Sequence, residues 1–370
     1  MTRLSFTRED ACRVWLSTAE INDSQRERLI ARYGCAETAY DEVQRHGAGS
    51  LSACGLSQRQ CAMLLQEAQR ENMHWRLVAM QQAKISLLYW DDPRFPRALR
   101  QLAAPPWLLF YRGDLHALMG KHLTMVGTRK CSTYGQRAAR QVAQELSESG
   151  VSIVSGMAPG IDTAAHDGCM AGPSPTVGWA GCGLEHPRPL GREGLDREIV
   201  EQGGLVLSEF PPGSDGLPYH YPMRNRLMSG MGDAVLFMEG RIRSGGMITV
   251  ECALEQGKDV FAYPGPVGKD GSEGPLQILR EGAILFRDAA DVLEDMGWES
   301  SVPASQRLNQ LPELDGDQQT VLSLLTVEEL SFDQLTFHTG FDPARLNATL
   351  TLLELQGLVL QGSGRIYHKV

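Results

Sequence analysis

The chain has 370 residues, of which 42% are hydrophobic, and carries a formal net charge of −10. This length predicts two or three domains, and the acidic balance excludes a surface coated with positive charge for duplex DNA while permitting a local basic groove. The sequence has no apolar run of about 18 residues, as a membrane span requires, and its first residues lack a signal-peptide core. We therefore expect a cytoplasmic protein without membrane association. The eight cysteines form no C-x-x-C pair and are expected to be reduced thiols.

Residues 1–84 are expected to form a helical domain of the SAM or helix-hairpin-helix kind. Several segments place apolar residues three and four positions apart, and glycines separate these segments. Residues 51–57 and the helix after them resemble half of a helix-hairpin-helix DNA module. A plain helical docking domain gives the same pattern and is the interpretation that we favour.

Residues 85–297 are expected to form an extended Rossmann-like domain, so the predicted fold class is α/β, with a mostly parallel sheet and helices on both faces. Prolines interrupt the apolar runs between residues 85 and 113, which predicts strands at one edge of the sheet. Short apolar runs then alternate with longer mixed segments, as buried parallel strands and helices do: 123–126, 151–155, 205–208, 234–239 and 260–264. Ligands of such sheets bind beyond the carboxyl ends of the strands.

The first of these runs leads through a glycine loop into a helix. Gly127 opens the loop, and Thr133, with Gln136 three residues later, is the predicted N-cap. Free backbone N–H groups at the helix start and the guanidinium of Arg129 would together hold a phosphate. Tyr134 is expected either in the domain core, which we favour, or against a base. The loop matches neither a dinucleotide fingerprint nor a P-loop.

Three more loops have a related form. Ser155 to Ala158 precede a helix for which Asp162 is the predicted cap, and His166 in that helix is predicted to be a packed core residue. Arg224 and Arg226 lie two positions apart, so they should point to different faces of a helix: one would anchor a carboxylate such as Glu209 or Glu239, and the other would reach the ligand. The last loop, residues 243–249, is another candidate phosphate cradle before a helix.

Five motifs in this order resemble those of the DprA/Smf (DNA-processing protein A) family: Gly127-x-Arg129-x-x-Ser132-x-Tyr134-Gly135, Ser155-Gly-x-Ala158-x-Gly160-Ile-Asp162, Ser208-Glu209-x-Pro211-Pro212-Gly213, Pro222-x-Arg224-Asn225-Arg226 and Ser244-Gly-x-x-x-Thr249. The resemblance implies a Rossmann-like domain that binds single-stranded DNA, forms a homodimer through that domain and loads a RecA-type recombinase during transformation and recombination. It implies no catalytic activity, and we expect neither a metal nor a cofactor.

Carried onto this sequence, the resemblance implies that Arg129, the Ser155 to Ala158 loop and the stretch after Leu184 line the DNA pocket. We add the residues of the two later motifs as candidates. The predicted DNA- or phosphate-binding residues are Gly127, Thr128, Arg129, Ser132, Ser155, Gly156, Met157, Ala158, Arg188, Arg192, Arg224, Asn225, Arg226, Ser244, Gly245, Gly246 and Thr249.

The chain also departs from the family pattern. Pro159 replaces an arginine, and Arg188 and Arg192 occupy positions where the family has tyrosine and asparagine. These departures leave open a regulatory or antitoxin-like paralogue that acts by protein contact. The loop at residues 243–251 also resembles that of the LOG-type nucleotide phosphoribohydrolases. A second alternative is therefore a nucleoside monophosphate phosphoribohydrolase with Glu251 and Arg226 at the sugar.

Residues 298–316 are predicted to be a linker, and residues 317–370 a winged-helix domain with three helices and a terminal hairpin. This domain resembles the C-terminal domain of many DprA members. Residues 305–370 contain eight Asp or Glu and four Lys or Arg residues. Because a reader of duplex DNA needs cations on its recognition helix, we expect a protein-docking or dimer-support module.

Overall fold

The computed structural model describes residues 6–19, 21–47, 49–185, 192–298, 314–325, 329–355, 358–362 and 365–369. The chain forms two compact units, residues 1–301 and residues 302–370, and each is described here by itself. Most of the predicted linker, residues 298–316, lies outside the described residues.

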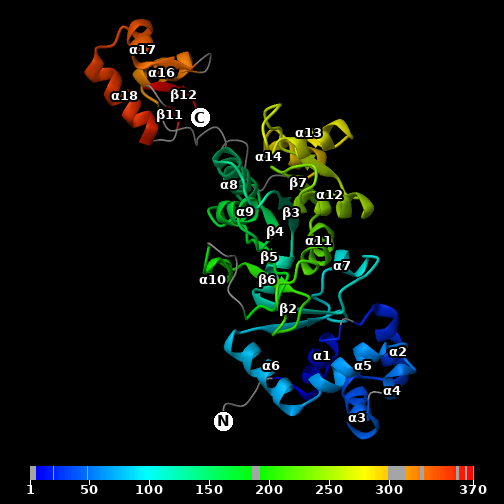
Figure 1. Ribbon diagram of the computed structural model, residues 1–370. Helices are drawn as coiled ribbons and strands as arrows, with labels where there is room; N and C mark the ends of the chain where they lie inside the picture. The colour runs from blue at the N-terminus through cyan, green and yellow to red at the C-terminus, as the bar shows by residue number, and fades with distance from the viewer. Residues whose placement is uncertain are drawn as a thin grey trace. The chain divides into compact units, whose positions relative to one another are not determined.

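The first unit begins with a group of short helices (Figure 1). Thr7, Asn22 and Ser57 each start a helix with a capping box. In it the side chain of the cap accepts a hydrogen bond from the backbone N–H three residues later, and the backbone N–H of the cap donates to the side chain of that later residue. Their apolar faces share one core around Trp15, whose indole N–H donates to the carbonyl of Leu64 at 2.8 Å. The helices are α1 (Arg8–Ser17), α2 (Asp23–Tyr33), α3 (Ala36–His46), α4 (Gly49–Ser52), α5 (Gln58–Glu67) and α6 (Arg70–Gln82).

A nine-stranded sheet follows, in the order β1-β2-β6-β5-β4-β3-β7-β8-β9. The pairs from β6 to β9 are all parallel, whereas β2 runs antiparallel to both β1 and β6. The predicted α/β class and the proline-flanked edge extension are therefore confirmed. The strands are β1 (Ser86–Tyr89), β2 (Leu108–Gly113), β3 (Lys121–Val126), β4 (Val151–Gly156), β5 (Val177–Trp179), β6 (Leu205–Ser208), β7 (Ala234–Phe237), β8 (Val260–Ala262) and β9 (Ile284–Leu285).

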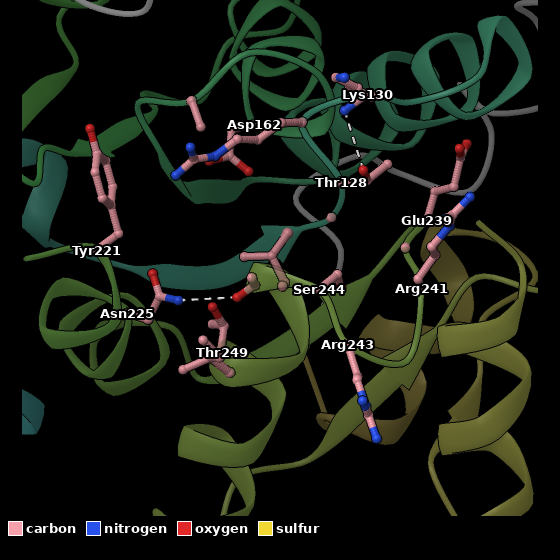
Figure 2. Close-up of a pocket in the computed structure, with 18 of the residues that line it drawn as sticks. Thr128, Lys130, Asp162, Tyr221, Asn225, Glu239, Arg241, Arg243, Ser244 and Thr249 are labelled. Carbon is pink, nitrogen blue, oxygen red and sulfur yellow. Dashed lines mark hydrogen bonds between the residues drawn. The ribbon is translucent and has the colours of Figure 1, made fainter. Parts of the chain in front are cut away.

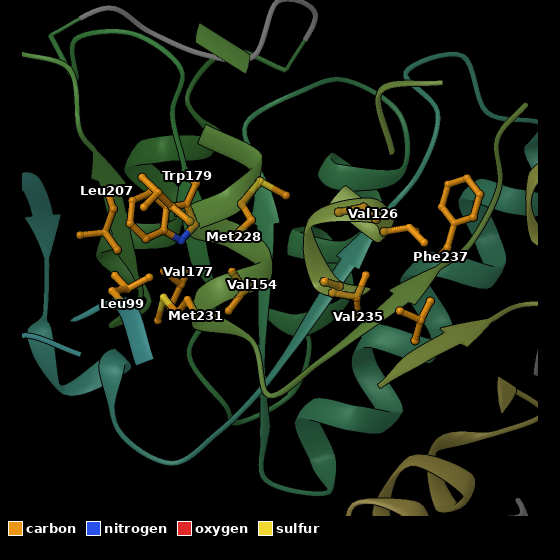
Figure 3. Close-up of a cluster of buried hydrophobic side chains, with 14 of the residues drawn as sticks. Leu99, Val126, Val154, Val177, Trp179, Leu207, Met228, Met231, Val235 and Phe237 are labelled. Carbon is orange, nitrogen blue, oxygen red and sulfur yellow. The ribbon is translucent and has the colours of Figure 1, made fainter. Parts of the chain in front are cut away.

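Helices cover both faces of this sheet. One face packs its core against α7, α11, α12 and α13, and Figure 3 shows Trp179, Met228 and Phe237 within this cluster. The other face packs against α8, α9 and α14. The helical elements are α7 (Arg97–Arg100), the 3₁₀ helix η1 (Leu115–Leu118), α8 (Thr133–Glu148), α9 (Ile161–Cys169), α10 (Leu195–Glu201), α11 (His220–Met231), α12 (Gly245–Glu255), α13 (Glu273–Arg280) and α14 (Ala289–Asp295).

The central strand β3 pairs in parallel with β4 on one side and with β7 on the other. The loops that leave these strands, which begin at Gly127, Met157 and Met238, therefore emerge at the same edge of the sheet. This topology places the predicted loops side by side.

The second unit is a winged helix, as predicted. Its core gathers apolar side chains from three helices and a three-stranded sheet with the order β10-β12-β11. Its elements are α16 (Gly316–Leu325), β10 (Leu330–Ser331), α17 (Phe332–Thr339), α18 (Pro343–Leu355), β11 (Val359–Gln361) and β12 (Ile366–Lys369). Among the described residues of the whole chain, no helix combines the length and the apolar character that crossing a membrane requires.

The buried centre of the sheet makes a testable prediction about stability. Leu236 in β7 is fully buried, so Leu236→Ala should leave a cavity and lower the free energy of unfolding by about 2–5 kcal/mol. Urea denaturation followed by tryptophan fluorescence measures this effect in the first unit, because all six tryptophans lie before residue 301. Leu254→Ala is the control: this side chain is 61% exposed, and its loss should change the free energy of unfolding by less than about 0.5 kcal/mol.

Candidate single-strand binding site

A pocket of about 690 Å³ opens at the carboxyl ends of β3, β4 and β7. Figure 2 shows Thr128 and Lys130 on one side of it and Asn225, Ser244 and Thr249 on the other. Three of the predicted loops and the start of α11 form its walls. The predicted residues that line it are Gly127, Thr128, Arg129, Ala158, Arg224, Asn225, Ser244, Gly245, Gly246 and Thr249.

The pocket is positively charged although the chain is acidic. Its lining holds five cations, Arg129, Lys130, Arg224, Arg241 and Arg243, against three carboxylates, Asp162, Glu239 and Asp270. Arg241 forms an exposed ion pair with Asp270 at 2.5 Å. Among the described residues, the other four cations form no ion pair within 4.0 Å. These charges are available to bind the phosphates of a nucleic-acid strand.

Arg129 is exposed, and its guanidinium lies over an aromatic ring. The guanidinium carbon is 4.8 Å from the centre of the Tyr221 ring, which comes from the start of α11. This cation–π contact holds the arginine in place while its donors stay open to a ligand. Arginine stacked on tyrosine offers both interactions that single strands use, a cation for phosphate and a flat surface for a base.

Beneath this pair, a second arginine is buried beside a carboxylate. Arg224 is only 4% exposed, and Asp162 is 7% exposed. Both groups press against the end of β4, because a Cβ atom at Gly156 would lie 2.4 Å from Arg224 Nη1 and 2.4 Å from Asp162 Oδ2. Only glycine leaves room for this arrangement.

Burial dominates the electrostatics of these groups. It raises the pKa of Asp162 to about 6, although the charges of Arg224 and Arg129 act in the opposite direction. Burial also lowers the pKa of Arg224, against the attraction of Asp162. The charged forms are therefore costly, and a phosphate near Arg224 would offset part of the cost of the charged guanidinium.

The start of α8 is not the free anion site that the sequence predicted. Ser132, not Thr133, is the N-cap, and its hydroxyl accepts a hydrogen bond from the N–H of Gly135 at 2.9 Å. The carboxylate of Glu239 already occupies the site, accepting from the Ser132 N–H at 2.9 Å and from its hydroxyl at 2.8 Å. Ser132 therefore holds an internal carboxylate and does not line the pocket.

The start of α12 differs, because no carboxylate caps it. Ser244 is its N-cap but makes no side-chain capping bond, and its buried hydroxyl has no hydrogen-bond partner among the described residues. Asn225 supports the loop by donating to the carbonyl of Gly245 at 3.2 Å. This helix start faces the pocket and is the better candidate for holding a phosphate.

Other predicted residues lie outside the pocket. Ser155 is fully buried and donates to the carbonyl of Met125 at 2.7 Å, and Met157 is packed in the core near Gly178. Arg226 binds Glu209 with contacts of 2.8 Å and 2.6 Å, so it is the anchoring member of the two arginines and Arg224 is the one that faces the pocket.

Arg192, one of the two substituted arginines, does not line the pocket. Arg192 forms ion pairs with Glu198 at 2.6 Å and with Asp167 at 3.2 Å, which uses its charge within the fold. Arg188 lies outside the described residues.

Three local predictions have definite outcomes. Gly160, not Asp162, is the residue before α9, and its φ of +87° suits glycine. Tyr134 is 57% exposed, so the expectation that it fills the core is wrong. His166 is confirmed as a core residue, with its ring nitrogens 2.7 Å from Thr176 Oγ1 and 3.2 Å from the carbonyl of Gly156.

Several residues that line the pocket were absent from the predicted set, among them the cations Lys130, Arg241 and Arg243 and the aromatic Tyr221. Lys130, Tyr221 and Arg243 each adjoin one of the motifs, so proximity to a motif was the available signal. Arg241 carries no such signal, because its position depends on the course of the chain after β7.

Neither residue of the hydrolase alternative lines the pocket. Glu251 is exposed on α12 and does not line the pocket, and Arg226 is bound to Glu209. Among the described residues, no group of three or more His, Cys, Asp and Glu side chains is arranged to hold a metal ion.

A mostly parallel sheet with a basic pocket at its carboxyl edge, followed by a winged helix, defines a two-unit protein with a Rossmann-like α/β fold. Residues 86–297 match the family described as DNA recombination-mediator protein A, and residues 305–365 match the DprA winged helix domain. The chain belongs to this DprA/Smf family.

Named relatives and solved structures support this assignment. Protein Smf of Escherichia coli K12 is 38% identical over 287 residues, which cover 76% of this chain and 74% of that protein. DNA processing protein DprA of Streptococcus pneumoniae is 39% identical over 204 residues, which cover 55% and 72%. The X-ray structure of DNA processing protein A from Streptococcus pneumoniae has a TM-score of 0.64 and 29% identity, and the match covers 78% of this chain and 98% of that one.

A further solved structure is that of DNA processing protein A from Helicobacter pylori, described as giving insights into its single-stranded DNA binding mode. It has a TM-score of 0.51 and 26% identity, and the match covers 58% of this chain and 95% of that one.

The buried Asp162 makes a testable prediction about pH. In the folded protein the pKa of Asp162 is raised from 3.8 to about 6. At pH values between these two, the folded state holds a proton that the unfolded chain has released. This group alone should make the free energy of unfolding rise as pH falls from about 7 to about 5. His166 acts oppositely, since burial lowers its pKa to about 4.

The test therefore compares the wild type with Asp162→Asn. This variant loses the titration of residue 162 and keeps that of His166. Urea midpoints at several pH values should show the wild type gaining stability relative to the variant as pH falls through 6. A difference between the two proteins that stays constant with pH would show that Asp162 does not titrate in this range.

Proposed function

We propose that this chain binds single-stranded DNA in the pocket at the carboxyl edge of its sheet. The observation that carries the proposal is Arg129, an exposed arginine that forms no ion pair with the described residues and whose guanidinium lies over the ring of Tyr221 in the pocket lining. Cations that follow the backbone and rings that accept bases are how proteins hold single strands without reading their sequence. Family membership and the single-stranded DNA binding described for the Helicobacter pylori protein support the same function.

In this proposal each wall of the pocket has a separate task. Arg129 contacts a phosphate while Tyr221 presents its ring to a base. Lys130 and Arg243 extend the positive track, and the start of α12 at Ser244 receives another phosphate. Arg224 adds a fixed positive charge from below. The proposed function requires no bond to be made or broken.

The proposal extends to partners. The family to which the chain belongs is described as recombination mediators, and this supports loading of a RecA-type recombinase onto the bound strand by a homodimer that associates through the Rossmann-like domain. Family membership supports a cytoplasmic location as well, because single-stranded DNA is handled there. Mixing the protein with a RecA-type recombinase and DNA coated by single-strand binding protein, then following filament assembly, tests this part.

Arg129→Ala tests DNA binding directly. Its affinity for a fluorescently labelled oligo-dT, measured by anisotropy, should fall by about tenfold or more because one charged phosphate contact is lost. The slope of log K against log salt should become shallower by about 0.7. Arg280→Ala is the matched control: Arg280 is exposed at the end of α13, away from the pocket lining, and its loss should change neither quantity.

If wild type and Arg129→Ala bind the oligonucleotide equally, or neither binds, the DNA proposal is wrong. A regulatory paralogue acting by protein contact would then explain the fold better.

The winged-helix unit is proposed to dock protein and not duplex DNA. The single cation of α18, Arg345, is bound through two contacts of 2.7 Å to Asp317, which leaves no free positive charge on that helix for a DNA groove. We expect isolated residues 302–370 to bind a DNA duplex more weakly than about 100 µM at physiological salt, as an electrophoretic mobility or anisotropy titration would measure. Tight duplex binding by this fragment would contradict the docking role.

A further inference from the structure

A second cleft, of about 830 Å³, lies between the N-terminal helices and the edge of the sheet. One wall comes from α1, α2 and α5, and the other from the segment after β6 and the start of α11. The second wall contains Glu209, Phe210 and Pro211 of the third family motif. That motif has no part in the pocket at Arg129, so its role is not explained by the site described above.

The cleft gathers apolar side chains that the fold leaves exposed. Met63, Leu217, Tyr219 and Met223 all line it, with exposed fractions of 38%, 40%, 50% and 41%. Behind them the rings of Phe210 and His220 are stacked, with centroids 3.9 Å apart. Apolar and aromatic groups exposed together in a concave place indicate a surface that a ligand covers.

The cleft also holds a cation that the fold does not use. Arg76 and Arg226 are neutralised by Glu67 at 2.8 Å and Glu209 at 2.6 Å. Arg59, on α5, is exposed, and among the described residues it forms no ion pair or side-chain hydrogen bond. An anionic ligand that rested on the apolar surface would therefore meet Arg59.

The cleft and the pocket at Arg129 share the start of α11 as a wall. Residues 219–223 separate the two: Tyr221 and Pro222 line the pocket, whereas Tyr219 and Met223 line the cleft. Tyr221 rests on the loop after β5, because a Cβ atom at Gly181 would lie 3.1 Å from its ring. Since β6 is parallel to β5 and ends just before Glu209, both hollows belong to the same edge of the sheet.

We infer that the cleft is a second segment of the single-strand path, in which a base stacks on Tyr219 and a phosphate contacts Arg59. This inference rests on the proposed function of the Arg129 pocket and assigns a DNA contact to the N-terminal helices. A peptide with acidic and apolar residues would suit the same side chains. The wall shared with the pocket at residues 219–223 favours the DNA strand, because a strand that leaves Tyr221 meets Tyr219 next.

Oligonucleotide length separates the two segments experimentally. An oligo-dT of about 6 nucleotides should occupy the Arg129 pocket alone, whereas one of about 20 should reach the cleft. We expect Arg59→Ala and Tyr219→Ala each to weaken binding of the long oligonucleotide by about fivefold or more and to leave the short one unchanged. For Arg59→Ala the salt slope of the long oligonucleotide should also become shallower by about 0.7.

The matched control is Arg45→Ala, an exposed arginine on α3 of the same group of helices that lines neither hollow. It should bind both oligonucleotides as the wild type does. Circular dichroism and urea midpoints of all variants should equal those of the wild type, which excludes loss of folding as the cause.

The outcomes distinguish this inference from the function on which it rests. Failure of the short oligonucleotide to bind, or its insensitivity to Arg129→Ala, would remove the proposed function itself. If the short one binds as expected but Arg59→Ala and Tyr219→Ala bind the long one like Arg45→Ala, the path does not enter the cleft and a protein segment is the indicated occupant. Binding of free dTMP that depends on Arg59, without any effect of length, would also overturn the inference.

Discussion

The parallel pairing of β3 with both β4 and β7 is the constraint on which the site depends. Parallel strands end at a common edge, so three loops that are far apart in sequence meet there. Each brings a different chemistry: Arg129 from the first loop, the buried Asp162 from the second and the open helix start at Ser244 from the third. Helix α11 then lies across the edge and adds Arg224 and Tyr221. If β3 lost either partner, the pocket would lose a wall.

Close approach at glycine is the second requirement. Gly156 lets Arg224 and Asp162 reach the end of β4, and Gly135 leaves space for the Glu239 carboxylate, whose Oε2 would lie 1.7 Å from a Cβ atom there. These two positions set which charges stay inside the fold and which face solvent. The arrangement buries one arginine near a carboxylate and leaves another, Arg129, stacked on Tyr221 at the surface.

The sequence predicted the fold class, the edge strands, the winged helix and part of the pocket lining, because these depend on local patterns. Apolar runs reveal buried strands, and glycine followed by a polar residue marks where each strand ends. What it missed depends on contacts across the fold. Nothing near Ser132 indicates that Glu239, from a distant loop, fills the start of α8, and nothing near Arg192 indicates its ion pairs with Asp167 and Glu198. Tyr134 was misplaced for the same reason. Its ring centroid lies 6.2 Å from that of Tyr263, which follows β8 and is far from Tyr134 in the sequence.

The carboxylate of Glu239 at the start of α8 has a consequence for selectivity. Because Glu239 already neutralises the start of α8, this helix terminus does not offer a binding site to a small anion. The remaining cations are spread along the pocket. Cations spread in this way favour a ligand whose anionic groups are covalently linked, because binding of one group raises the effective concentration of the next. Inorganic phosphate and single nucleotides, abundant in any cell, would then compete poorly against a polymer, and the site would stay available to the molecule whose length matches it.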